Sequence, residues 1–231
     1  SGKSSARLFS TAVLNALTPR FTLKTEHDDG IRTKRIFWID DLVTDKLVQG
    51  LDEGVVTAEA MSISRGLADL PGNVCTPAYL AEAVQNAAAG MTTVEVEVLD
   101  EHQIEELGMG AFLSVAKGST VPPRFIAIRY RGTNAALPPV AFVGKGITFD
   151  TGGISLKPAA NMADMTYDMS GAAVVIGTVM AAARAKLPVN LLGVVAACET
   201  FPRAAPPSRA TSSPPSRARR LRSSTPTARA A

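Results

Sequence analysis

One short segment limits what this chain can fold into more than any other. Residues 140–143 form an apolar run typical of a buried strand, and they lead directly into a glycine-rich loop that holds Lys145, Asp150 and Lys157. Charges at the end of a buried strand are costly unless something pairs them. A metal centre with a lysine that polarises the substrate would do so, which favours a hydrolase-type site.

The order of the expected elements predicts the fold class. Helices are expected at 55–70, 76–89, 100–107, 111–117 and 171–186, and strands at 93–99, 124–130, 140–144 and 189–198. Strands that alternate with helices indicate an α/β fold, a layered and mostly parallel sheet flanked by helices. Because ligands bind beyond the carboxyl ends of parallel strands, Lys145 stands where chemistry is expected.

Composition narrows the class of protein. The 231 residues are 46% hydrophobic, which suffices for a core, and no apolar run is long enough to span a membrane. Cys75 and Cys198 are too few for a disulfide scaffold, which favours a reduced cytoplasmic setting. The chain starts at Ser1 without a signal-peptide core, so we expect an internal fragment.

Four segments together resemble one family. Residues 143–173 resemble the leucyl aminopeptidase family, the cytosolic M17 metallo-aminopeptidases, and residues 70–81, 107–111 and 188–193 extend the likeness. The resemblance covers residues 55–202 and implies a partial metallo-aminopeptidase catalytic domain there. Before it, residues 1–54 are expected to be the remnant of an N-terminal domain or linker, with a short strand at Phe37–Ile39.

The resemblance implies a role for each site residue. Two divalent metal ions, manganese or zinc, would share Asp150 as a bridging carboxylate, and Asp168 would bind one of them. Lys145 would be an unusual nitrogen ligand, which requires a neutral amine. Lys157 would stay protonated and stabilise the oxyanion, and Met165 would line the pocket for the first substrate side chain. The family hydrolyses N-terminal residues from peptides and is typically a homo-hexamer.

The end of the chain departs from this family. Residues 203–231 hold seven arginines and no acidic residue, and without them 17 basic residues face 21 acidic ones. Read one nucleotide late in a GC-rich gene, the family's continuation gives this Arg/Pro/Ser-rich tail, so we expect a frameshift near Pro202 and a disordered product. The family's second acidic cluster then falls on Thr227, Arg229 and Ala231. Two-metal occupancy should collapse, and the chain should have little or no peptidase activity.

Several charged residues are open to a second interpretation. From composition alone, Lys145 and Asp150 could form a surface ion pair or belong to an anion site. Asp164 is better explained as a solvated residue at a helix start than as a ligand. His27 and His102 are expected to be surface histidines.

The sulfur-containing residues and the tail can be explained without chemistry. Cys75 and Cys198 are expected in the core, and Met162, Met165 and Met169 could be packing residues. Residues 189–198 would become an exposed apolar edge if no further strands follow. The basic tail could make the chain a non-catalytic nucleic-acid-binding or interaction remnant, but no aromatic residues interleave with its arginines, so nucleic acid is not the expected partner.

Overall fold

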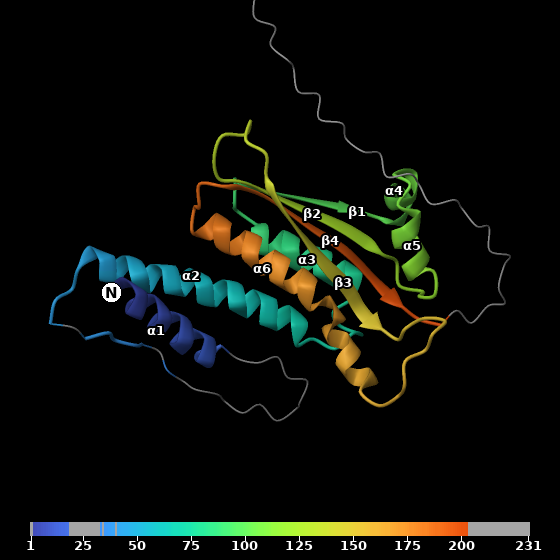
Figure 1. Cartoon of the computed structure of the whole chain (residues 1–231), viewed down its shortest axis with the longest axis horizontal. Helices are drawn as coiled ribbons and strands as arrows, with labels where there is room; N and C mark the ends of the chain where they lie inside the picture. The colour runs from blue at the N-terminus through green and yellow to red at the C-terminus, as the bar shows by residue number, and fades with distance from the viewer. Residues whose placement is uncertain (1, 19–32, 34, 40, 203–231) are drawn as a thin grey trace, which may run out of the picture.

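The computed structural model describes residues 2–18, 33, 35–39 and 41–202 (Figure 1). The 203–231 tail and His27 therefore lie outside the described residues. In chain order the elements are α1 (Gly2–Leu17), α2 (Asp45–Ala68), α3 (Pro77–Ala88), β1 (Val94–Leu99), α4 (Glu101–Glu106), α5 (Gly110–Ala116), β2 (Arg124–Arg131), β3 (Val140–Asp150), the 3-10 helix η1 (Met162–Met169), α6 (Ser170–Arg184) and β4 (Asn190–Thr200).

The elements stack in layers. Helices α3 and α6 pack on one face of the sheet, α2 packs on α6, and α1 packs on α2 (Figure 1). The short helices α4 and α5 lie together at one end of the sheet. This layered arrangement of helices on a sheet confirms the predicted α/β class.

The prediction of a mostly parallel sheet is wrong. The strand order is β1-β2-β4-β3, and only β3 and β4 run parallel, whereas β1 with β2 and β2 with β4 are antiparallel. The chain between β1 and β2 passes through α4 and α5 at one end of the sheet, so β2 returns in the opposite direction. Only the β3–α6–β4 connection crosses back along the full sheet, as a parallel pair requires.

The prediction of an exposed edge at residues 189–198 is also wrong. Strand β4 lies between β2 and β3, with a partner on each side, and β3 is the edge of the described sheet. Most of β4 is accordingly buried. Its apolar run fits this central position, with a hydrogen-bonded strand on each side.

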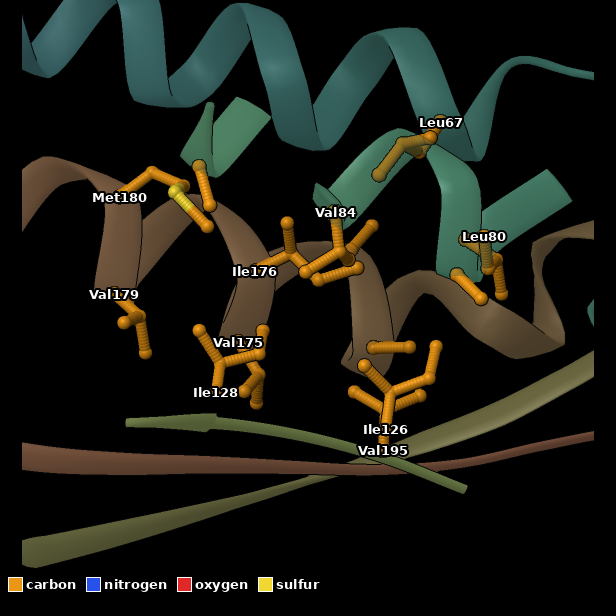
Figure 2. Packing of buried hydrophobic residues seen from close by; sticks show 14 of the residues in the cluster. Leu67, Leu80, Val84, Ile126, Ile128, Val175, Ile176, Val179, Met180 and Val195 are labelled. Carbon is orange, nitrogen blue, oxygen red and sulfur yellow. The ribbon is translucent and has the colours of Figure 1, made fainter. Parts of the chain in front are cut away.

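The core lies between the sheet and helices α3 and α6. Figure 2 shows Ile126, Ile128 and Val195 rising from the strands toward Ile176 on α6 and Val84 on α3. All five side chains are fully buried. Burying an aliphatic side chain of this size stabilises the fold by about 1.5–3 kcal/mol. This cluster therefore fixes α6 on the sheet, and with it the start of α6 beside β3.

Side-chain caps mark the starts of α2, α3 and α4. Thr76 caps α3 by accepting a hydrogen bond from the backbone N–H of Tyr79, with Pro77 in the first turn, and Asp100 forms a capping box with Gln103 at the start of α4. Helix α2 begins earlier than expected, because Thr44 already caps it.

At the start of the chain, the expected strand is wrong and the expected domain boundary stays open. Residues Phe37–Ile39 are not a strand, and helix α1 was not predicted. Helix α2 runs without a break across the expected domain boundary after residue 54; that boundary stays a prediction.

One helical run among the described residues passes a length and composition test for a membrane span. It covers Met162–Arg184, and half of its most apolar window is buried inside the protein. Since α6 is the main core helix, packing accounts for its apolar character.

Candidate metal centre

The middle of β3 and the start of α6 meet backbone to backbone. A Cβ on Gly144 would lie 2.6 Å from the carbonyl oxygen of Gly171, and a Cβ on Gly171 would lie 3.0 Å from the backbone nitrogen of Lys145. Glycine is therefore needed on both sides of this contact. The contact places η1, which immediately precedes α6, directly beside β3.

Four of the predicted site residues form one charge cluster in this structure. Lys145 Nζ lies 2.7 Å from Asp168 Oδ2 and 3.9 Å from Asp150 Oδ2. Lys157 Nζ lies 2.8 Å from Asp150 Oδ2. The residues come from β3, from the loop after it and from η1, so their convergence is a result of tertiary structure rather than of sequence proximity. We call Lys145, Asp150, Lys157 and Asp168 the charge cluster.

Asp168 is incompletely satisfied within this cluster. Its Oδ2 atom is buried and accepts no hydrogen bond from the described residues, although the Lys145 ammonium lies close to it. The Lys145 ammonium therefore pairs with the charge of Asp168 Oδ2 without a hydrogen bond of good geometry. A buried carboxylate oxygen in this state is costly and is typical of a site that binds a further cation.

Asp150 is held strongly in its ionised form. Burial raises its pKa, but hydrogen bonding with the Asp168 carboxyl group, with Lys157 and with the backbone N–H of Gly152, together with the positive charge of Lys157, lowers it from 3.8 to about 2. The Gly152 N–H donates to Asp150 Oδ1 over 2.8 Å. Gly152 has a φ of +88°, which glycine adopts at low cost, so the tight turn after β3 depends on this residue.

Lys157 also contacts Met165. Its ammonium donates to the Met165 Sδ atom over 3.0 Å. The structure therefore brings Met165 to the charge cluster through Lys157. It does not place Met165 on the wall of the neighbouring cleft.

That cleft lies between α5, the outer face of β3 and the loop after β3. Its volume is about 710 Å³, within the range of small-molecule sites. Lys145 and Asp150 open onto it, together with Lys117 and Gly118 from the end of α5 and Phe201 after β4. A peptide end is small enough to enter a space of this size.

Asp164, His102 and the two cysteines lie where the sequence predicts them. Asp164 is exposed in the first turn of η1, and His102 is exposed on α4. Cys75 and Cys198 are buried and unpaired. Burial raises the pKa of the Cys75 thiol to about 11, which removes it as a nucleophile at neutral pH.

Sequence reasoning missed one buried polar pair beside the cleft. The carboxylate of Glu199, at the end of β4, is almost fully buried and accepts a hydrogen bond of 2.8 Å from the Ser119 hydroxyl. The sequence did carry a signal for this pair, because Glu199 follows an apolar run just as Asp150 does.

The donor set fits one cation better than two. No group of three or more His, Cys, Asp and Glu side chains suited to a metal occurs among the described residues. Asp150 and Asp168 supply two carboxylates, one with an orphaned buried oxygen, and Lys145 could add a nitrogen. Oxygen ligands of this kind suit a hard divalent ion.

Comparisons with known proteins agree with this arrangement. The structure is similar to the bottromycin maturation enzyme BotP in complex with Mn, with a TM-score of 0.71 and 28% identity over 86% of this chain and 40% of that one. The chain is 52% identical over 164 residues to a "Probable cytosol aminopeptidase" of Azoarcus sp. strain BH72, and 50% identical over 183 residues to one of Bordetella pertussis.

These matches cover only part of each relative's length. The two alignments cover 71% and 78% of this chain but 33% and 37% of those relatives, so the chain spans about a third of their length. The family profile described as "Cytosol aminopeptidase family, catalytic domain" matches residues 62–207, which is more than half of the chain and includes the whole charge cluster. The chain belongs to the cytosol aminopeptidase family.

Proposed function

We propose that this chain carries part of the metal site of an aminopeptidase that releases N-terminal residues, of the leucine type, from peptides in the cytoplasm. The observation that carries the proposal is the convergence of Lys145, Asp150, Lys157 and Asp168 at the end of β3. The relatives are named cytosol aminopeptidases, and a similar structure holds manganese. These names support the substrate class, the compartment and the kind of ion.

Each side chain has a role in the proposal. Asp150, Asp168 and Lys145 would hold a divalent ion, manganese or zinc, which supplies Lewis-acid activation of a peptide carbonyl when bound. Lys157 would stay charged and stabilise the oxyanion that forms on the substrate. Met165, in contact with Lys157, would pack against the first substrate side chain.

The proposal includes weak or absent turnover. Two metals need more carboxylates than Asp150 and Asp168, and the positions expected to match the second cluster are Thr227, Arg229 and Ala231. A threonine cannot replace an ionised carboxylate, and an arginine would place a cation beside the ions. We expect purified protein to hydrolyse leucine p-nitroanilide far more slowly with manganese or zinc than a full-length relative does. Comparable rates would overturn this part of the proposal.

Metal binding itself tests the site. We expect calorimetry to show one Mn²⁺ or Zn²⁺ ion bound per chain, and Asp168→Asn to weaken binding at least tenfold, because it removes a ligand with an unsatisfied buried oxygen. Asp164→Asn, an exposed change on the same 3-10 helix, is the matched control and should bind like the parent. Absence of binding to the parent protein would refute the proposed site.

A further inference from the structure

The cleft beside the charge cluster has a second cationic wall. Lys117 is the C-cap residue of α5 and lines the cleft together with Lys145 and Asp150, which come from β3. Among the residues that line the cleft, Asp150 is the one carboxylate. The two walls therefore differ in chemistry: one is the charge cluster, the other a lysine alone.

The charges of this cleft do not balance. Lys145 and Lys157 are both paired with aspartates of the charge cluster. Lys117, in contrast, has no ion pair or hydrogen bond from its side chain within the described part of the chain. It therefore adds a positive charge that no side chain among the described residues compensates, and it does so in a space where a ligand fits.

The backbone that carries Lys117 is anchored rather than loose. The Ser119 hydroxyl donates to the buried Glu199 carboxylate and accepts the backbone N–H of Val121 over 2.9 Å. Gly118 packs so closely on the end of β4 that an added Cβ would lie 1.8 Å from the carbonyl oxygen of Phe201. These contacts tie the Lys117 wall to the strand that also positions β3, so the distance across the cleft is fixed by the fold.

We propose that Lys117 binds a carboxylate of the peptide substrate, on the C-terminal side of the residue whose amine and carbonyl lie at the charge cluster. The inference rests on the proposed aminopeptidase function and names its substrate class: short peptides with an anionic group soon after the first residue. The carboxylate can be the C-terminus of a dipeptide or an acidic side chain in second position. Both place one negative charge opposite the unpaired ammonium of Lys117.

Calorimetric titration of the full chain with four peptides tests this directly. Leu-Gly is compared with Leu-Gly amide, and Leu-Asp amide with Leu-Asn amide, in the presence of Mn²⁺, because the proposed function places the amine and carbonyl at the ion and expects weak or absent turnover. We expect the parent to bind the charged member of at least one pair roughly three- to tenfold more tightly, as for a partly exposed charge-assisted contact. The pair that shows the preference identifies which carboxylate is bound.

Variants of Lys117 separate this inference from the function it rests on. Lys117→Met should bring the ratio of the two affinities in each peptide pair close to one, while leaving the affinity for the uncharged amide unchanged. Lys117→Arg should retain the preference for the charged peptide. Lys46→Met, which changes an exposed lysine on α2, should behave like the parent. If the parent binds both members of each pair equally, or if Lys117→Met keeps the preference, the inference is wrong although the aminopeptidase site stands. If none of the peptides binds to the parent, the proposed function and the inference both fall.

Discussion

Replacing Asp150 by asparagine should destabilise the protein by an amount that can be worked out from the site. The side chain is 17% exposed and interacts with Lys157, Lys145 and the Gly152 N–H. Asparagine keeps the shape but cannot compensate the two ammonium groups. Because the cluster contains as many lysines as aspartates, the variant leaves a net positive charge at the end of β3.

The pKa of Asp150 sets the magnitude. Its fall from 3.8 to about 2 on folding corresponds to about 2 kcal/mol of stabilisation at pH 7. For a carboxyl group whose folded pKa is depressed, this stability is present in full above the unfolded pKa and is lost as the pH falls through the folded pKa. The contribution should therefore be about 2 kcal/mol at pH 7, about 1 kcal/mol at pH 3 and close to zero below pH 2.

The difference in unfolding free energy between the parent and Asp150→Asn can be measured by urea unfolding between pH 7 and pH 3. A chelator is present throughout. Asp164→Asn is the matched control, since Asp164 is exposed on η1 and forms no ion pair with described residues. We expect the control to unfold with the parent at each pH. The reasoning is refuted if Asp150→Asn is as stable as the parent at pH 7, or if the difference does not shrink in acid.

Three further outcomes are expected. Gly144→Ala should lower the free energy of unfolding by about 1–3 kcal/mol, because its Cβ meets the backbone of Gly171. Gly66→Ala lies in open space on α2 and should raise the free energy of unfolding by about 0.5–1 kcal/mol. Thermal unfolding of both variants measures these changes. Ser119→Ala should cost about 1–3 kcal/mol in urea unfolding, since it leaves the buried Glu199 carboxylate without its hydrogen bond, while Ser114→Ala on exposed α5 should cost much less. Cys75 and Cys198 should resist a disulfide reagent at pH 8 in folded protein and react in urea, because burial raises the pKa of both thiols, to about 11 and about 12; rapid labelling without denaturant would contradict their burial.

Local patterns in the sequence predicted local structure well. Thr76 with Pro77 marked the start of α3, and the capping box at Asp100 marked α4, because these signals act through hydrogen bonds within one turn. Helix α6 has no such side-chain cap, and its run of small apolar residues marked it instead. The role of the charged residues around the end of β3 was predicted from their resemblance to a family motif. The structure adds the distances between their charged atoms.

Strand direction and strand order could not be predicted in this way. Whether β2 runs parallel to β1 depends on where α4 and α5 pack, and no residue within β2 records that choice. The same limit explains why β4 was expected at an edge, although it lies between β2 and β3. Glu199 was overlooked because a single acidic residue after a strand becomes informative only when Ser119 is seen against it.

The sequence predicted the part of the fold that holds the site only in outline. Helix α6 and strand β4 lie at the expected residues, whereas β3 continues past the expected end at residue 144 to Asp150, and η1 was not predicted. Strand β3, η1, α6 and β4 form one continuous crossover, and β3 with β4 is the one parallel pair of the described sheet. Both aspartates of the charge cluster lie within this unit, and the Gly144–Gly171 contact sets their separation. A change in the antiparallel half of the sheet would therefore reach the cluster through β4 or through the packing of β2 on α6. An added methyl group at Gly144 would instead move η1 directly and weaken metal binding without replacing a ligand.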